Sequence, residues 1–417
     1  MRILHTSDWH LGQHFYGKSR AQEHQKFLDW LLEQVAHYQI DVIIIAGDIF
    51  DTGTPASYAR EMYFDFVVKV KGLNCQLVIL AGNHDSVAML GESKQVLASL
   101  STKVIPSVTE DMDEQVFMLN NKAGEQAAVI CAVPFIRPRD VIKSQAGHSS
   151  EQKQTQLQQS IAEHYQHLYD RAQELANGRL PLIATGHLTA VGAKASDSVR
   201  DIYIGTLDAI PASIFPPFDY IALGHIHRPQ VVAKSEHIRY SGSPIPLSFD
   251  EAGQEKQLIM IELEQNAVTQ ITPIKIPCFQ PMMMVKTDLD KLGTEIESVL
   301  KAHDNQASIW LDIEIESGDY LQDLQQRIED LVAGTAIEVL LVRRSKKARQ
   351  SMTGQQKKIT LNELTLDEVF SARLDLEEWQ TDEEQHRKQQ LTDLFRKISH
   401  DTLDESSPAV FGALEQA

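Results

Sequence analysis

Residues 42–48 read Val-Ile-Ile-Ile-Ala-Gly-Asp. The apolar run predicts a buried strand, and a glycine and an acidic residue follow it directly. The same order of apolar run, glycine and polar residue returns at 77–83, 182–187 and 220–225. A glycine at such a turn allows positive φ or close approach of another segment. The pattern predicts an open α/β sheet with its chemistry at the strand ends.

Candidate metal ligands occur in five fragments, which are Asp8-Trp-His10, Gly47-Asp48, Gly82-Asn-His84, Gly186-His187 and Gly224-His-Ile-His227. The ligand count predicts two ions. The first would be held by Asp8, His10, Asp48 and His227. The second would be held by Asn83, His187, His225 and the shared Asp48. Two ions bridged by a carboxylate clamp the attacking and leaving oxygens of a displacement at phosphorus, so we expect hydrolysis of a phosphate ester.

His84 and Asp51 are the candidate catalytic residues outside this ligand set. His84 adjoins Asn83, so we expect it to face the substrate as the general acid for the leaving sugar oxygen, or as a transition-state donor. Asp51 follows Asp48 by three residues and could orient the His84 ring. It could equally close the turn before Thr52.

The five fragments together resemble the calcineurin-like metallophosphoesterases. The segments 1–12, 46–52, 80–86, 200–205 and 240–246 resemble the SbcD family of nuclease subunits within that group, and the likeness runs over nearly the whole chain. The resemblance implies that the seven ligands bind manganese and that His84 is the catalytic histidine. Asp51 stands where archaeal and eukaryotic relatives usually have a second active-site histidine, so the role of that histidine does not carry over.

The resemblance also implies activities and partners. These are a manganese-dependent 3′ to 5′ exonuclease on double-stranded DNA, an endonuclease on hairpins and single strands, and roles in DNA repair, recombination and replication. The implied assembly is a heterotetramer of an SbcC-like ATPase with a dimer of this subunit. The residue types alone leave manganese, iron and zinc open. They also leave open a small-molecule metallophosphodiesterase or phosphatase, and a non-catalytic scaffold.

Composition limits the possible classes of protein. The chain has 417 residues, of which 42% are hydrophobic, and a formal net charge of −19. We expect a cytoplasmic protein, because no apolar run reaches the ~20 residues of a membrane helix, a strand expected from residue 2 leaves no room for a signal peptide, and three scattered cysteines indicate a reducing compartment. The acidic balance disfavours DNA binding by phosphate neutralisation alone, so the metal ions or a partner must supply positive charge.

The periodicity of the chain predicts four regions. Alternating strands and helices indicate a two-sheet αββα metallophosphoesterase sandwich over 1–278, with a helical polar insert at 143–177 and a second sheet built from the short strands after His227. Strand, helix, strand, helix, strand at 279–345 predicts a small α+β domain, which the resemblance makes a capping domain. A basic linker at 346–360 and a helical pair at 361–417 follow, and the resemblance implies that the pair docks on the ATPase.

Two basic segments are candidates for contact with DNA. Arg137 and Arg139 follow the apolar run 127–133, and arginine binds phosphate through two parallel hydrogen bonds. An internal ion pair with Asp140 is the alternative. The basic run comprises Arg343, Arg344, Lys346, Lys347 and Arg349. It is either a contact for DNA or partner, or a solvated linker.

Overall fold

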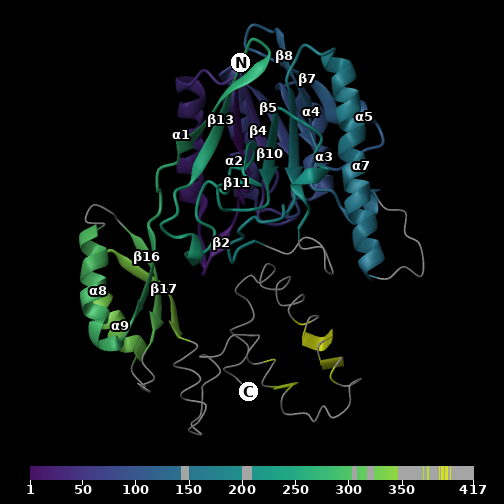
Figure 1. Ribbon diagram of the computed structural model, residues 1–417. Coiled ribbons are helices and arrows are strands. Elements are labelled where there is room, and N and C mark those ends of the chain that lie inside the picture. Colours follow the sequence, from purple (N-terminus) through teal and green to yellow (C-terminus); the bar gives the residue numbers. More distant parts are fainter. Residues whose placement is uncertain are drawn as a thin grey trace. The chain divides into compact units, whose positions relative to one another are not determined.

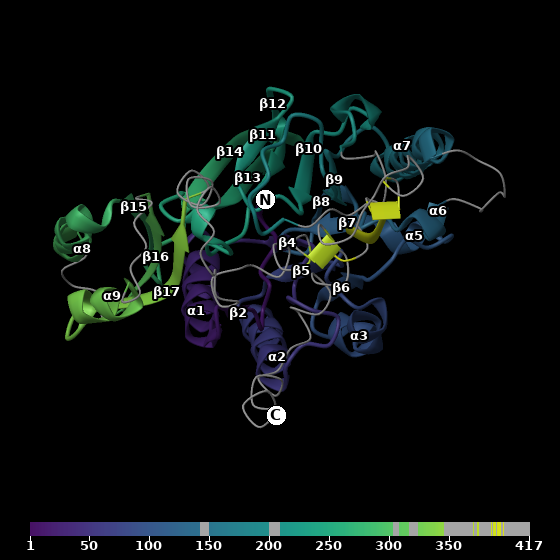
Figure 2. The same cartoon turned by 90° about the horizontal axis from the view of Figure 1, so that it is seen from below.

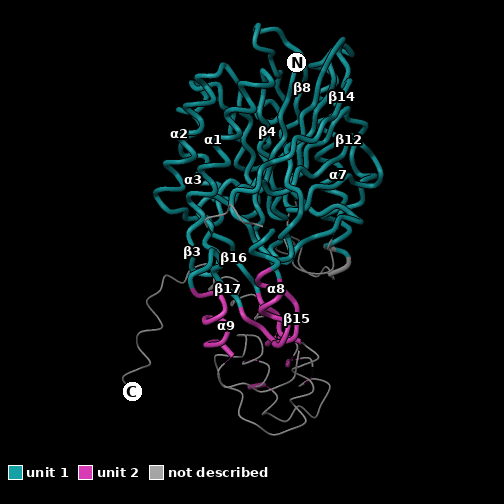
Figure 3. The backbone as a smooth tube through the Cα atoms, turned by 90° about the vertical axis from the view of Figure 1, so that its left-hand side faces the viewer, with its two compact units in different colours: residues 1–284, 298–312, 334–341 teal, residues 285–297, 313–333, 342–417 magenta. Residues whose placement is uncertain are grey.

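The computed structural model describes residues 1–141, 150–199, 209–302, 308–316 and 324–345, together with isolated positions after residue 369. The chain divides into two compact units (Figure 3). The first comprises 1–284, 298–312 and 334–341, and the second comprises 285–297, 313–333 and 342–417. All of the candidate ligands and catalytic residues belong to the first unit.

Two six-stranded sheets build the first unit. The order in the first sheet is β14 (Ala267–Lys275), β13 (Gln257–Glu264), β1 (Arg2–Thr6), β4 (Val42–Ala46), β5 (Gln76–Leu80) and β6 (Thr102–Ile105). The order in the second sheet is β11 (Gln230–Val232), β12 (Ser235–Tyr240), β10 (Tyr220–Gly224), β9 (Leu182–His187), β8 (Gln126–Cys131) and β7 (Val116–Asn120). Strands β1, β4, β5 and β6 are parallel, as are β8, β9, β10 and β12. The carboxyl ends of each parallel set therefore share one edge.

A core shared by both sheets explains the unbroken apolar runs. Val42 and Ile44 from the first sheet cluster with Ile130 and Ile183 from the second. Because these strands are covered on both faces, they lack the alternation of a half-buried strand. The outer face of the first sheet packs on α1 (Ala21–His37) and α2 (Ser57–Gly72), and that of the second packs on α7 (Ser150–Ala176). Figures 1 and 2 show α1 and α2 on the opposite side of the sheets from α7.

Short elements complete the first unit. They are β2 (His14–Phe15), β3 (Lys18–Ser19), α3 (Val87–Glu92), α4 (Lys94–Ala98), α5 (Met112–Gln115), α6 (Pro138–Val141) and the 3-10 turns η1 (Ala212–Ile214) and η2 (Phe249–Glu251). No helix among the described residues is both long enough and apolar enough to span a bilayer.

The strands after His227 do not all join the second sheet, which corrects the expectation from the sequence. Strands β11 and β12 extend that sheet, but β13 and β14 belong to the first, where β13 runs antiparallel to β1. Residues Leu258 to Ile261 are buried on both faces of the strand. A run buried in this way carries no pattern that selects its neighbour, so the sequence did not distinguish the two sheets.

The predicted order of elements in 279–345 is observed. A three-stranded sheet runs β15 (Met282–Thr287), β16 (Ile309–Ile315), β17 (Ile337–Arg344), with α8 (Leu289–Ala302) and α9 (Leu324–Val332) between the strands in sequence. Apolar residues at every second position of β16, such as Ile309 and Leu311, are buried, as expected of a strand with one face on a core, but Trp310 between them is buried too. The reason is that Trp310 packs in a cluster with Phe15 and Phe249.

The expected linker at 346–360 lies outside the described residues, as does most of the expected helical tail at 361–417. Phe370 and Phe395, one from each expected helix, stack with ring centroids 3.9 Å apart. Of the basic run, Arg343 and Arg344 end β17, and the other three residues are not described.

Candidate metal centre

The carboxyl ends of strands from both sheets bring the candidate ligands together. Asp8 and His10 follow β1, Asp48 follows β4, Asn83 follows β5, His187 ends β9, and His225 and His227 follow β10. The ligand atoms of Asp8, His10 and His227 lie within 4.8 Å of one another, and so do those of Asp48, His187 and His225. All six of these side chains are buried. The structure therefore gathers the members of both expected ion sets into one site.

Several of these residues have strained backbone conformations. The φ angles are 55° at Asp8, 48° at His10, 51° at Asp48 and 93° at His225, all in the left-handed region that side chains rarely adopt. Hydrogen bonds hold the turns in place, because the Asp8 amide donates to Gly47 O at 3.0 Å and the His10 amide donates to Asp48 O at 3.1 Å. Strain of this kind gathers where function requires a particular side-chain direction.

His187, Asp48 and Asn83 form the centre of one ligand group. The carbonyl oxygen of Ala46 lies 2.9 Å from His187 Nδ1 and accepts its proton, so Nε2 presents a lone pair. That Nε2 lies 2.9 Å from Asn83 Oδ1 and 3.2 Å from Asp48 Oδ2, both acceptors. These three atoms need a cation among them, either a second proton on the ring or a metal ion. Burial alone would lower the pKa of His187, but the Asp48 carboxylate raises it to about 9. The raised pKa shows that the acceptor atoms around Nε2 stabilise a positive charge at that position.

On the His10 side of the site, histidine nitrogens are likewise left available for a cation. His10 Nδ1 donates to Asp51 Oδ1 at 3.2 Å, which leaves Nε2 for a ligand role. Nε2 of His10 and Nε2 of His225 are buried and have no hydrogen-bond partner among the described residues. An unsatisfied buried nitrogen costs about 1–3 kcal/mol. Two such atoms beside buried carboxylates fit a site that holds divalent ions, which take His, Asp and Asn donors.

Close approach explains the glycines that precede the ligands. A Cβ on Gly82 would lie 2.1 Å from Asp48 Oδ1, and one on Gly224 would lie 1.9 Å from the Ala46 carbonyl oxygen. These turns therefore lack side chains because the neighbouring turn occupies the space. The sequence allowed two reasons for a glycine here, a positive φ angle or the close approach of another segment. Close approach is the reason at Gly82 and Gly224.

His84 lies beside the candidate ligand groups and is half-buried, whereas the candidate ligand histidines are buried. Its amide donates to Asp48 Oδ1 at 2.9 Å, and its Nδ1 donates to the backbone oxygen of Asp51 at 2.7 Å. The carbonyl of Asp51 thus contacts His84, while the carboxylate of Asp51 contacts His10. His84 also falls in a third possible ligand group with His10 and Asp48.

Asp85 is a residue of the site that sequence reasoning missed. Its carboxylate accepts from the amides of Ile49 at 3.1 Å, Phe50 at 3.0 Å and Gly82 at 2.8 Å. It thereby joins the turn after β5 to the turn after β4. An acidic residue directly after Asn83-His84 was a possible signal, but nothing local showed which amides it would meet.

The two arginines differ in their surroundings. Arg137 is half-buried, its Nη2 donates to the backbone oxygen of Asp85 at 3.3 Å, and its buried Nη1 has no hydrogen-bond partner among the described residues. Arg139 has a side chain that is 78% exposed and lies 3.8 Å from Asp140. Arg137 is therefore attached to the turn that carries His84, and Arg139 extends into solvent.

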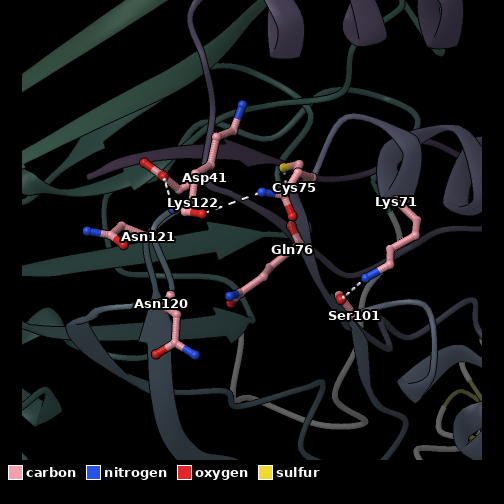
Figure 4. Close-up of a pocket in the computed structure, with 10 residues that line it drawn as sticks. Asp41, Lys71, Cys75, Gln76, Ser101, Asn120, Asn121 and Lys122 are labelled. Atoms are coloured by element: carbon pink, nitrogen blue, oxygen red, sulfur yellow. Dashed lines mark hydrogen bonds between the residues drawn. The ribbon is translucent and has the colours of Figure 1, made fainter.

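A small pocket of about 140 Å³ lies at the amino-terminal ends of β4 and β5, away from the ligand cluster (Figure 4). Its polar groups bond to one another, since Asp41 accepts from the Lys122 amide at 2.7 Å and Lys71 donates to Ser101 at 2.7 Å. The candidate ligands lie at the other edge of the sheets, where seven polar side chains converge.

The fold and site define the class of protein. The sequence model of the calcineurin-like phosphoesterases matches residues 1–229, more than half of the chain, so the chain belongs to this family. A second model, described as the type 5 capsule protein repressor C-terminal domain, matches residues 278–378. The family implies a hydrolase that uses divalent metal ions, which agrees with the gathered His and Asp side chains.

Similarity to curated proteins specifies the family further. The chain is 50% identical to the SbcD subunit of the nuclease SbcCD from Escherichia coli K12, over 96% of this chain and 98% of that protein. The SbcD subunit from Rhodobacter capsulatus is 34% identical, over 74% of this chain and 76% of that protein. The SbcD subunit from Bacillus subtilis is 31% identical, over 77% of this chain and 80% of that protein. The chain therefore belongs to the SbcD family of nuclease subunits. A β-glucosidase structure from Micrococcus antarcticus aligns with a TM-score of only 0.22 at 11% identity, which indicates no common fold.

Proposed function

We propose that this protein is the nuclease subunit of an SbcCD-like complex and hydrolyses DNA phosphodiesters with the help of two divalent ions, for which the family resemblance implies manganese. One observation carries the proposal: seven His, Asp and Asn side chains from two sheets converge, with the half-buried His84 beside them. Membership of the SbcD family supports DNA as the substrate.

Asp8, His10, Asp48 and His227 would hold one ion, and Asn83, His187, His225 and the shared Asp48 would hold the other. Divalent ions in such sites make hydroxide available near neutral pH and neutralise charge at the reacting phosphate. The protein itself supplies the proton for the leaving oxygen. Because the Asp51 carbonyl holds one proton on His84 Nδ1, Nε2 is the nitrogen left to face the departing sugar oxygen. Nε2 would donate to that oxygen from the imidazolium form, in which the ring carries a second proton on Nε2.

The remaining regions complete the proposal. We assign 1–278 to the αββα nuclease domain, 279–345 to a capping domain that places DNA, 346–360 to a linker and 361–417 to docking on an SbcC-like ATPase. The acidic chain, with its net charge of −19, makes a partner useful, because DNA binding by one protomer has little basic surface to rely on. The proposed activities are exonuclease action from 3′ to 5′ on double strands and endonuclease action on hairpins, in repair, recombination and replication.

A comparison of substrates tests the proposal. Manganese-dependent cleavage of a DNA hairpin and hydrolysis of a small aryl phosphodiester are each measured with and without the ATPase. We expect hairpin cleavage that the ATPase stimulates. Efficient hydrolysis of the aryl ester with no DNA cleavage would favour a small-molecule phosphodiesterase instead, and activity on neither would favour a scaffold.

A further inference from the structure

A buried carboxylate that belongs to neither ion set lies behind the ligand His227. Glu251, at the end of η2, is fully buried. It accepts hydrogen bonds from Ser196 Oγ at 2.7 Å, Ser198 Oγ at 2.6 Å and the Leu247 amide at 3.1 Å. The same carboxylate therefore joins the loop after β9 to the segment after β12.

Lys256 completes the charge balance of this network. Its Nζ lies 2.5 Å from Glu251 Oε2 and is buried with it, so the pair is an ion pair without solvent. Lys256 Nζ also donates to the backbone oxygen of His227 at 3.0 Å and to Ser243 Oγ at 2.9 Å. A buried charge requires such compensation. The lysine thus holds the backbone of the ligand residue and neutralises the carboxylate behind it.

The protons in this network determine the tautomer of His227. Ser198 has one hydroxyl proton and lies 2.6 Å from Glu251 Oε1, an acceptor only, so it donates there. His227 Nδ1 lies 2.7 Å from the same Ser198 oxygen and 3.3 Å from Glu251 Oε1. Nδ1 must therefore carry the proton and donate it. Nε2 is left with its lone pair, which is the form that a metal ligand needs.

We propose that Glu251 and Ser198 are positioning residues for the metal centre, which hold His227 in the ligand tautomer and orientation through the chain Glu251, Ser198, His227. This inference rests on the proposed function, because it assigns His227 to an ion. Partners of ligand histidines raise metal affinity by fixing the ring, and their loss costs about 10- to 100-fold in affinity. Two other candidate ligands are held in the same way: the Ala46 carbonyl accepts the Nδ1 proton of His187, and the Asp51 carboxylate accepts that of His10.

The effect should be confined to one ion. Of the two expected ion sets, only the first contains His227, and His187 and His225 of the other set do not contact Glu251 in any described hydrogen bond. A defect in this network should therefore weaken one manganese site selectively. A merely structural role would instead lower the stability of the fold and weaken both sites together.

The test is manganese binding to the full-length protein, measured by titration calorimetry and by electron paramagnetic resonance. We expect Glu251→Gln to weaken one of two sites by about 10- to 100-fold and leave the other as in wild type. Glu255→Gln is the matched control, because Glu255 is 70% exposed and pairs with Lys275 at the surface. It should bind two ions with wild-type affinity.

Variants of Ser198 keep the test decisive if Glu251→Gln does not fold. Ser198→Ala removes only the hydroxyl between Glu251 and His227 and should give the same selective loss, whereas Ser198→Thr keeps a hydroxyl and should restore binding. Wild-type affinity at both sites in folded Ser198→Ala would overturn the inference, as would equal weakening of both. A wild-type protein that binds no manganese would overturn the proposed function itself, and this inference with it.

Discussion

The Asp48 carboxylate lies 3.2 Å from Nε2 of His187, and this contact joins the two sheets at their carboxyl edges. Asp48 follows β4 of the first sheet, and His187 ends β9 of the second. Neither sheet holds a complete ion set by itself, because the first supplies the aspartates and the second supplies three of the histidines. The packing of one sheet on the other therefore creates the site.

His84→Ala should reduce turnover by roughly 100-fold while two manganese ions remain bound, because His84 is proposed to donate a proton and not to hold an ion. Turnover on a DNA hairpin and manganese stoichiometry are measured on the same preparation. Loss of an ion in this variant would contradict the assignment and place His84 in the ligand group with His10 and Asp48 that the geometry also allows.

Asp51→Asn separates the two contacts of that residue. The carbonyl of Asp51 stays in place against His84, but the charge beside His10 Nδ1 is lost. We expect manganese affinity at one site to fall by about 10- to 100-fold, with turnover at saturating manganese changed little. The opposite result, unchanged affinity with a large loss of turnover, would mean that the carboxylate acts on His84 or on the substrate.

Gly82→Ala should destroy the metal centre, because the new Cβ would lie 2.1 Å from Asp48 Oδ1 and 2.4 Å from the Asp48 amide nitrogen. Overpacking of this kind costs about 1–3 kcal/mol of stability and here displaces the shared carboxylate. Gly72→Ala is the control, since that position has open space around it. Thermal unfolding and manganese binding measure both effects. Retention of two ions by Gly82→Ala would show that the turn can move without loss of Asp48.

Arg137→Gln should weaken DNA binding by the protein, because Arg137 is only half-buried and its guanidinium group contacts the turn that carries His84, which puts a positive charge beside the proposed reaction site. If Arg137 contacts one phosphate, the negative slope of log affinity against log salt should be less steep by about 0.9 in Arg137→Gln than in wild type. Arg171→Gln is the control, because Arg171 pairs with Asp113 and Glu174 on the surface. An unchanged slope with lower stability would assign Arg137 to internal packing.

His5 should make the protein less stable in acid. Its ring is buried, with Nδ1 2.9 Å from the Tyr220 hydroxyl and Nε2 3.2 Å from the Leu223 oxygen, and burial lowers its pKa to about 3. The unfolded chain has a histidine pKa of about 6.5, so between these values the unfolded state binds more protons and stability falls as pH falls. The contribution is up to about 1.4 kcal/mol for each pH unit.

Urea unfolding between about pH 7 and pH 5 measures this slope. His5→Gln should show a smaller loss of stability per pH unit than wild type, and His37→Gln, which replaces an exposed histidine, should behave as wild type. Equal slopes in all three proteins would mean that His5 binds as many protons in the folded as in the unfolded state.

The local part of this fold could be predicted from the sequence. The strands before Asp8, Asp48, Asn83, His187 and His225 occur where the apolar runs place them. Consecutive apolar residues followed by a glycine and a polar residue carry that information in a few neighbouring positions. The candidate ligands, His84 and the order of elements in 279–345 were all named from such patterns.

The contacts between distant segments could not be predicted in this way. The pairing of β13 with β1 depends on which sheet has an edge available, and Leu258 to Ile261 would be equally buried in either. Glu251 and Asp85 looked like ordinary acidic residues, because their partners come from other turns. The contact of the Asp51 side chain with His10 could not be predicted either, because His10 comes from a turn that is distant in the sequence.

By itself, then, the sequence determined which residues could bind metal and which strands present them, because strand burial and turn chemistry are properties of short segments. Only the tertiary structure decided that Asp48 and His187 meet, that the Asp51 carboxylate contacts His10, and that Glu251 stands behind His227. These relationships depend on how two sheets pack, and packing is the joint outcome of the whole core.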